Sequence, residues 1–154
     1  MAKQNTMEER LAHLNEERAR VQAGGGEARI AKQHEKGKLT ARERIAVFTD
    51  PGSFIETGAF RKNRTTAFGR DKADMPADGV VTGHASVMGR PVYVASQDFT
   101  VVGGSAGEVH NTKVSDLPLF YQDKVRSAIV VPDLQAAATT TEELRVLAQR
   151  CIAQ

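Results

Sequence analysis

Residues 78–114 constrain the fold of this chain more than any other segment. They read in order as a strand over 79–87, a reversal at Met88-Gly89-Arg90, a second strand over 91–102, a glycine loop and a helix starting near Ser105. Glycine adopts a positive φ without strain, so Gly89 predicts a tight turn. The segment therefore predicts a β-hairpin followed by a helix, with a ligand-binding corner between them.

Length and composition predict one domain that works in a reducing, cytoplasmic setting. The chain has 154 residues, of which 40% are hydrophobic, and its formal net charge is only +2, so bulk charge indicates no partner. The lone Cys151 can form no disulfide within the chain. The first residues lack the apolar core of a secretion signal, and no segment approaches the roughly 18 apolar residues of a membrane span.

Three helices are expected before the hairpin. Thr6 and Glu9 form a capping-box pattern that predicts a helix over 7–22, and the glycines at 24–26 end it. Its apolar stripe is narrow, so we expect this helix to lie on another surface or on a partner. A short basic helix follows over 27–36. Thr40 and Glu43 then begin a third helix, which the turn at 50–52 ends.

The remaining segments complete an α+β pattern. We expect a short strand over 53–60, a polar loop over 61–76, and a helix over 105–114 that the sequence Asp116-Leu117-Pro118 cuts short. Further on, 127–131 reads as a strand and 136–141 as a linker. Thr140 and Glu143 then cap a last helix that carries an apolar stripe to Ile152.

The glycine loop over 101–107 is the main candidate for ligand binding. Its glycines permit close backbone approach, and the first N–H groups of the following helix are expected to point outward unpaired, which suits an anionic or carbonyl oxygen. The simpler interpretation is a sharp turn in which Ser105 only caps the helix. The spacing is not that of a phosphate loop, and no Lys follows the glycines.

Other chemistries find little support. No His has a second ligand at metal-binding spacing, so no metal site is predicted. Glu108 and His110 diverge around a helix and are both expected at the surface or facing a partner. Asp98 is expected to bond backbone N–H groups in a turn, although it could instead orient a neighbour. No serine sits in a nucleophile elbow, so hydrolysis is not supported.

The basic residues between 29 and 44 could gather a polyanion or simply solvate a helical face, and the second interpretation is favoured. They lack interleaved aromatic residues, so no nucleic-acid binding is predicted.

Several motifs together resemble one enzyme family. They are Gly24-Gly-Gly26, Arg29 through Ile45, Asp50-Pro-Gly-Ser-Phe54, Phe68-Gly69, Asp78-Gly-Val-Val-Thr-Gly83, Ser96 through Thr100 and Gly103 through Glu108. In this order they resemble the N-terminal part of the carboxyltransferase (beta) subunit of biotin-dependent acyl-CoA carboxylases. Residues 58–66 and 76–79 look most like the propionyl-CoA or methylmalonyl-CoA type, and the chain is similar also to the large subunit of transcarboxylase.

The resemblance implies a partial ClpP/crotonase-like fold with N-terminal helices, a hairpin and a short helix. It implies an acyl-CoA substrate, biotin on a partner carrier protein, and a biotin carboxylase partner. In such enzymes backbone N–H pairs stabilise the oxyanion, so no catalytic side chain is assigned. The implied CoA contacts are Thr100, Val101, Gly103, Gly104 and Ser105, with the basic run as a weaker candidate for the phosphates.

The resemblance covers most of this chain but only the opening part of a family member, and it stops near Val114. We therefore expect a helical segment over 1–52, the first strand, hairpin and helix unit over 53–114, and a divergent part over 115–154. The chain is interpreted as a short or truncated carboxyltransferase subunit, inactive alone because the oxyanion loops are missing. The alternatives are a non-catalytic docking module for a full-length carboxylase and a truncation product. A homo-oligomer or a complex with a full-length subunit is expected, with no membrane partner.

Overall fold

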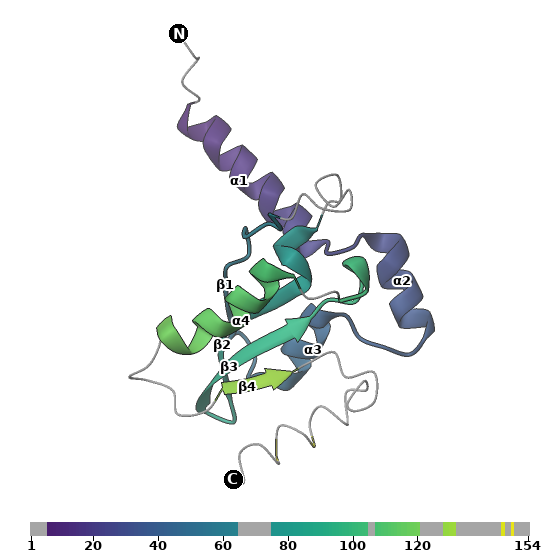
Figure 1. The fold of residues 1–154 in the computed structure, drawn as a ribbon, viewed down its shortest axis with the longest axis vertical. Helices are drawn as coiled ribbons and strands as arrows, with labels where there is room; N and C mark the ends of the chain where they lie inside the picture. The colour runs from purple at the N-terminus through teal and green to yellow at the C-terminus, as the bar shows by residue number, and fades with distance from the viewer. Residues whose placement is uncertain are drawn as a thin grey trace.

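The computed structural model describes residues 6–64, 75–104, 107–120 and 128–131, with the single positions 146 and 149. Its elements are helices α1 (Met7–Gln22), α2 (Glu27–Glu35) and α3 (Ala41–Phe48), strand β1 (Ile55–Thr57), the helical turn η2 (Pro76–Gly79), strands β2 (Val80–Val87) and β3 (Arg90–Gln97), the turn η3 (Val102–Gly104), helix α4 (Glu108–Phe120) and strand β4 (Ala128–Val131) (Figure 1). The α+β prediction is confirmed. The predicted linker over 136–141 and the cap at Thr140 lie outside the described residues.

Capping boxes set the starts of two helices where the sequence predicts them. At α1 the Thr6 hydroxyl accepts from the Glu9 N–H, and the Glu9 carboxylate accepts from the Thr6 N–H at 2.8 Å. Thr40 and Glu43 repeat this exchange at the start of α3. Both devices join residues three positions apart, so their geometry depends on local sequence alone.

The sheet has four strands in the order β1-β2-β3-β4. Strands β2 and β3 form the predicted antiparallel hairpin, with Val80 opposite Gln97 and Val87 opposite Arg90. Strand β1 pairs antiparallel with β2 and is shorter than expected, while β4 runs parallel to β3. Helix α4 thus lies in the connection between two parallel strands, as a βαβ unit requires.

The hairpin turn is held from outside the hairpin. Met88 and Gly89 both have positive φ, at 50° and 77°, as the favoured two-residue turn demands. The Asp50 carboxylate accepts from both of their N–H groups, at 2.8 and 2.9 Å. The hydrogen bond from Gly89 is the main reason why the pKa of Asp50 is lowered. Asp50, two residues after the end of α3, therefore also fixes the β2–β3 turn.

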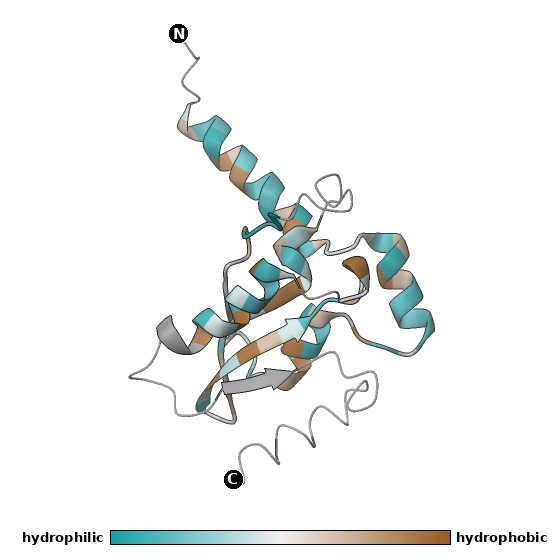
Figure 2. Ribbon diagram, in the orientation of Figure 1, coloured by the Kyte–Doolittle hydropathy of each residue, from teal (hydrophilic) through white to brown (hydrophobic). Residues whose placement is uncertain are grey.

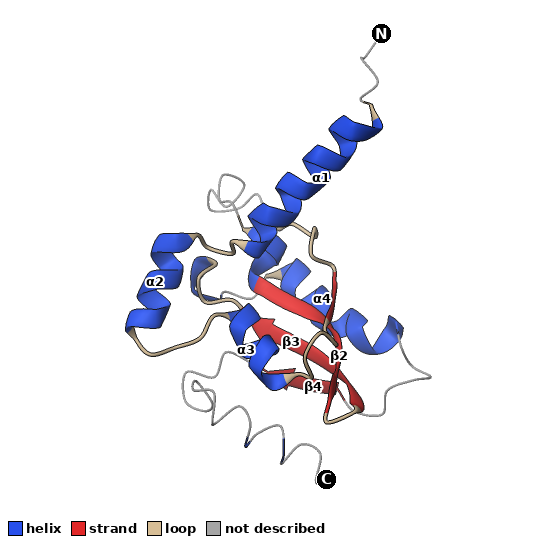
Figure 3. Cartoon of the chain, turned by 180° about the vertical axis from the view of Figure 1, so that it is seen from behind, coloured by secondary structure: helices blue, strands red, loops and turns tan. Residues whose placement is uncertain are grey.

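Alternate residues of the hairpin pack against two different helices, so the sheet lies between α3 and α4 (Figure 3). One face buries Val81, Val92 and Val94 against the α3 residues Ala41, Ile45 and Phe48. The other buries Val80, Tyr93 and Ala95 against Leu117 of α4. This alternation follows from the two-residue period of a strand. Apolar residues accordingly follow the strands and the inner side of α3 in Figure 2.

The predicted ends of two elements were wrong, and α4 begins at Glu108 rather than near Ser105. The second strand was expected to reach residue 102 but ends at Gln97, because the Asp98 carboxylate bonds the Thr100 N–H and turns the chain. The helix expected to stop before Pro118 continues to Phe120. Its last turns are held by tertiary contacts, since Leu117 is buried in the core and Asp116 pairs with Arg61. Packing here overrides the local preference of proline.

Helix α1 projects from the body of the molecule and is attached near its C-terminal end (Figure 1). Val21 is its only buried residue. The side chains of its apolar stripe remain open in the described structure, with exposed fractions of 68% for Met7, 52% for Leu11 and 36% for Leu14. The stripe therefore lies on no surface that the described part of this chain provides.

Candidate functional site

The glycine corner, residues 98–104, begins where β3 ends. The Asp98 carboxylate accepts from the Thr100 N–H at 2.9 Å and from the Thr100 hydroxyl at 2.5 Å. Asp98 and Thr100 are both buried. This arrangement confirms the predicted turn role of Asp98, because a carboxylate that bonds the backbone two residues onward defines such a turn.

The corner rests on the glycines that end α1. The Gly25 N–H donates to the Thr100 hydroxyl at 2.9 Å, and the Arg29 guanidinium donates to the Thr100 carbonyl at 3.2 Å. A Cβ added to Gly25 would lie 1.8 Å from that carbonyl oxygen. Only glycine permits this approach. The sequence suggests a helix stop at 24–26, but the same glycines also form the contact that positions the corner.

The predicted CoA contacts divide into buried and exposed residues. Thr100 and Val101 are buried, at 4% and 2% exposed, and the Thr100 hydroxyl is already bonded to Asp98 and Gly25. Gly103 is exposed and Gly104 is half-buried against the Phe99 ring. Ser105 lies outside the described residues. Thus the backbone of η3 is the part of the corner that a ligand can reach.

The exposed part of the corner has an unusual backbone. Val102, Gly103 and Gly104 all have positive φ, at 47°, 63° and 72°. A β-branched residue rarely adopts this conformation, and the Val102 side chain is 41% exposed. Such strain persists only where surrounding contacts impose it, and it gathers at functional sites.

The start of α4 is not free to bind an anion as the sequence suggests. The Asp78 carboxylate accepts from the His110 N–H at 2.6 Å, so one of the N–H groups expected to point outward already has a partner. Asp78 itself has a φ of 51°, between Ala77 at 52° and Gly79 at 68°. Its capping role was missed because it lies 32 positions away in sequence; aspartate tolerates this backbone shape better than most residues.

His110 was expected at the surface or facing a partner, and this expectation was wrong. Its side chain is only 3% exposed, because the first turn of α4 packs against η2 and β3. Burial lowers the pKa of His110, which the neighbouring Asp78 partly opposes. Glu108, by contrast, is exposed as predicted and pairs with Arg64 at 3.1 Å.

The basic run over 29–44 is partly built into the fold. The Arg44 guanidinium is buried and donates to the Gln97 carbonyl at 2.6 Å, and burial lowers its pKa to about 10. Arg42 pairs with Glu56 at 2.7 Å. Lys32 and Lys36 remain exposed, so the favoured interpretation of a solvated face applies only to part of this run.

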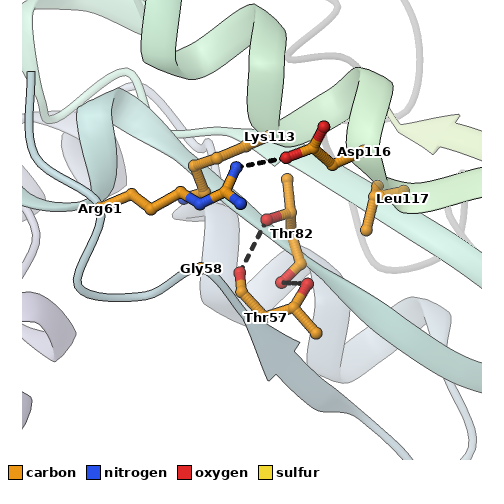
Figure 4. A pocket seen from close by; sticks show the side chains of 7 residues that line it. All are labelled: Thr57, Gly58, Arg61, Thr82, Lys113, Asp116 and Leu117. Carbon is orange, nitrogen blue, oxygen red and sulfur yellow. Dashed lines mark hydrogen bonds and ion pairs between the residues drawn. The ribbon is translucent and has the colours of Figure 1, made fainter. Parts of the chain in front are cut away.

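A second concave feature, the α4 pocket, lies between α4 and strands β1 and β2 (Figure 4). Its volume is about 270 Å³, and it is lined by Thr57, Gly58, Arg61, Thr82, Lys113, Asp116 and Leu117. The Arg61 guanidinium donates to the Asp116 carboxylate at 2.6 Å. Lys113 is 2% exposed, donates to the carbonyls of Ala77 and Val80, and has its pKa lowered by burial to about 8. No motif in the sequence indicates this pocket, because its lining residues come together only in the folded chain.

Within the described ranges, no three His, Cys, Asp or Glu side chains are grouped so that they could hold a metal ion. No helix in the described part of the chain is long and apolar enough to cross a membrane.

Among the curated proteins to which the chain is similar are two carboxyltransferase subunits. Over 110 residues it is 63% identical to the methylmalonyl-CoA carboxyltransferase 12S subunit of Propionibacterium freudenreichii subsp. shermanii, a match to 71% of this chain and 21% of that protein. Over 109 residues it is 53% identical to the carboxyltransferase subunit of propionyl-CoA carboxylase from Haloferax mediterranei, with the same coverage. The chain thus spans about a fifth of the length of these relatives.

Solved structures agree with this similarity. A crystal structure of transcarboxylase 12S, described as a hexamer with methylmalonyl-coenzyme A and methylmalonic acid bound, matches with a TM-score of 0.72 and 58% identity over 77% of this chain and 23% of that one. A single-chain long-chain acyl-CoA carboxylase matches with a TM-score of 0.66 and 28% identity over 96% of this chain and 16% of that one. The fold is therefore part of a crotonase-like carboxyltransferase fold.

The family signature described as the carboxyl transferase domain matches residues 32–146. It continues past Val114, where the resemblance stated from the sequence ends. Because the match covers well over half of the chain, this protein belongs to the carboxyl transferase domain family.

Proposed function

We propose that this chain contributes the first part of the acyl-CoA-binding half of a carboxyltransferase subunit for methylmalonyl-CoA or propionyl-CoA. The 63% identity to the methylmalonyl-CoA carboxyltransferase 12S subunit carries this proposal. Biotin on a partner carrier protein would supply the carboxyl group after a biotin carboxylase has loaded it. This chain's own part is to hold the acyl-CoA.

The glycine corner is the proposed contact for the adenosine end of CoA. Gly103 and Gly104 would meet the ligand through their backbone, because glycine has no side chain to cover its main-chain groups. Thr100 and Val101 would act from beneath. The Thr100 hydroxyl accepts from the Gly25 N–H and the Thr100 carbonyl accepts from Arg29, while the Val101 side chain is buried below the corner. Ser105, which follows η3, belongs to the same proposed contact.

The isolated chain is proposed to bind acyl-CoA without transferring a carboxyl group. An oxyanion in this chemistry needs a pair of preorganised N–H donors. At the start of α4, the His110 N–H is occupied by the Asp78 carboxylate. The donors that complete the reaction site would therefore come from other segments or another chain.

Binding of methylmalonyl-CoA, measured by titration calorimetry, tests the corner. Gly103→Ala adds a methyl group at an exposed backbone position where no protein atom lies within 4 Å. Gly37→Ala is the matched control, because Gly37 also has a positive φ, at 70°, and equally open surroundings. We expect Gly103→Ala to weaken binding at least about tenfold, as the loss of one well-placed contact does, and Gly37→Ala to leave it unchanged. Equal effects would contradict the proposed contact.

Turnover is tested separately. The purified chain is mixed with a biotin carboxylase, a biotinylated carrier and propionyl-CoA, and methylmalonyl-CoA formation is measured with and without a full-length carboxyltransferase subunit. We expect product only when that subunit is present. Product formation by this chain without it would overturn the proposed incomplete site.

A docking module remains a second candidate, and the exposed stripe on α1 favours it. Met7, Leu11 and Leu14 are open to solvent, and exposed apolar side chains at helical spacing are suited to a partner surface. The test is whether this chain captures a full-length carboxyltransferase subunit and whether Leu11→Asp abolishes that capture. Capture that depends on Leu11, in a chain that binds no acyl-CoA, would favour docking over substrate binding.

A further inference from the structure

The α4 pocket has an apolar interior and a charged rim. Leu117 is 4% exposed and lies in the wall, and the stem of Lys113 passes close to Gly58, where an added Cβ would lie 3.3 Å from the lysine Cε. Thr57 and Thr82 form the floor, and each hydroxyl is bonded to the other's carbonyl oxygen. Figure 4 shows Arg61 and Asp116 meeting across the opening. This combination suits a small molecule with a polar end and an aliphatic part.

Arg61 is the cation that a ligand in the pocket can reach. The Lys113 ammonium is buried and donates to the carbonyls of Ala77 and Val80, and the Glu56 and Asp78 carboxylates stabilise its charge. The Arg61 guanidinium, in contrast, is partly exposed and faces the Asp116 carboxylate. A ligand group that joins or replaces Asp116 at Arg61 should therefore carry a negative charge, which favours a monoanion over a cation.

Arg61 has the geometry to bind that monoanion. Its side chain is 40% exposed, and its hydrogen bond to Asp116 uses a single nitrogen, Nη1. A guanidinium presents five N–H donors in a planar fork that matches a carboxylate with two parallel hydrogen bonds. A ligand carboxylate can therefore bind Arg61 beside Asp116 or in its place.

We propose that the α4 pocket is a binding site for a small aliphatic monocarboxylate, with Arg61 as the carboxylate anchor and Leu117 and the Lys113 stem against the aliphatic part. None of the lining residues that the structure describes belongs to the glycine corner. The site therefore stands independently of the proposed acyl-CoA contact, and each can fail without the other.

Sodium propionate is the probe, titrated into the full chain at constant ionic strength and followed by NMR through the amide signals of Gly58, Arg61 and Asp116. We expect saturable shifts of these signals. Propionamide has nearly the same shape without the charge, and we expect it to produce none.

Three variants make the test specific. Arg61→Gln removes the anchor and should weaken propionate binding about tenfold or more, as the loss of charge-assisted hydrogen bonds does. Asp116→Asn removes the competing carboxylate and should tighten binding about threefold or more. Lys62→Gln removes a charge from the same loop but not from this pocket, since Lys62 pairs with Glu17 at 3.1 Å. It should change the affinity by less than about twofold.

The opposite effects of Arg61→Gln and Asp116→Asn cannot both come from loss of folding. Equal binding of propionate and propionamide would overturn the proposal. Weaker binding by Asp116→Asn would also overturn it. An effect of Lys62→Gln as large as that of Arg61→Gln would do the same, because it would indicate general attraction of the anion to the basic loop.

Discussion

Gly25 lies so close to the Thr100 carbonyl that no larger residue fits without moving the backbone. We expect Gly25→Ala to lower the free energy of unfolding by about 3 kcal/mol or more, because overpacking against main-chain atoms cannot be relieved by a rotamer change. Gly37→Ala is the control. Its φ is 70° and no atom lies within 4 Å of an added Cβ, so it should cost only about 1–2 kcal/mol of backbone strain. Urea unfolding measures both, and a smaller cost for Gly25→Ala would contradict the contact.

Buried His110 predicts a pH dependence of stability. Its pKa is lowered by burial, so on acidification the unfolded chain takes up this proton before the folded chain does. The free energy of unfolding should therefore fall as the pH drops through the ordinary histidine value of about 6.5, and the loss is complete below the folded pKa. Thermal unfolding between pH 8 and pH 5 measures this dependence.

The variant His110→Gln should flatten that dependence. His13→Gln is the matched control, because His13 is exposed on α1; it should leave the slope as it is in the unsubstituted chain. A slope unchanged in His110→Gln would mean that another group titrates. The sequence could not predict this behaviour, because the burial of His110 depends on η2 and β3 packing around α4 rather than on the two-residue spacing from Glu108.

Helix α4 receives its cap from a distant residue. The Asp78 carboxylate bonds the His110 N–H from the turn before β2. Asp78→Ala should lower the free energy of unfolding by about 1–2 kcal/mol, the usual loss for a helix cap. Asp78→Asn keeps a side-chain oxygen and tolerates the left-handed backbone, so it should cost clearly less. Denaturant unfolding compares the two, and equal costs would show that the hydrogen bond contributes nothing.

The elements that the sequence predicted well are those set by neighbouring residues. The capping boxes at Thr6 and Thr40 start α1 and α3 where expected, and Gly89 locates the hairpin turn. The ends of β3 and α4 were missed, because Asp98 and the buried Leu117 act through contacts that close only in the folded chain. The same reason applies to the site: the position of the corner followed from its glycines, but the inward direction of Thr100 depends on Gly25, 75 residues away.

At the scale of the whole molecule, the described part of the chain has its sheet between α3 and α4, with α1 extending from the body. The two core clusters lie on the faces of the hairpin, whereas α1 reaches the body near its C-terminal end, through buried Val21 and the ion pair of Glu17 with Lys62. The corner lies where these parts meet, because the glycines after α1 support Thr100. Displacement of α1 is therefore coupled to the corner through the segment over 24–26 rather than through the exposed stripe.

The exposed stripe and the buried Val21 predict that substitutions along α1 have unequal effects on stability. In the free chain, Leu11→Ser and Leu14→Ser should each change the free energy of unfolding by less than about 0.5 kcal/mol beyond the lower helix propensity of serine, because both side chains are exposed. Val21→Ala should cost about 2 kcal/mol, because Val21 is buried at 5% exposed.

Hydrogen exchange should agree, with amides around Leu11 exchanging through local fraying and those of α3 only through larger opening. Protection around Leu11 equal to that of α3 would show that α1 is covered, and the stripe would then already have its partner.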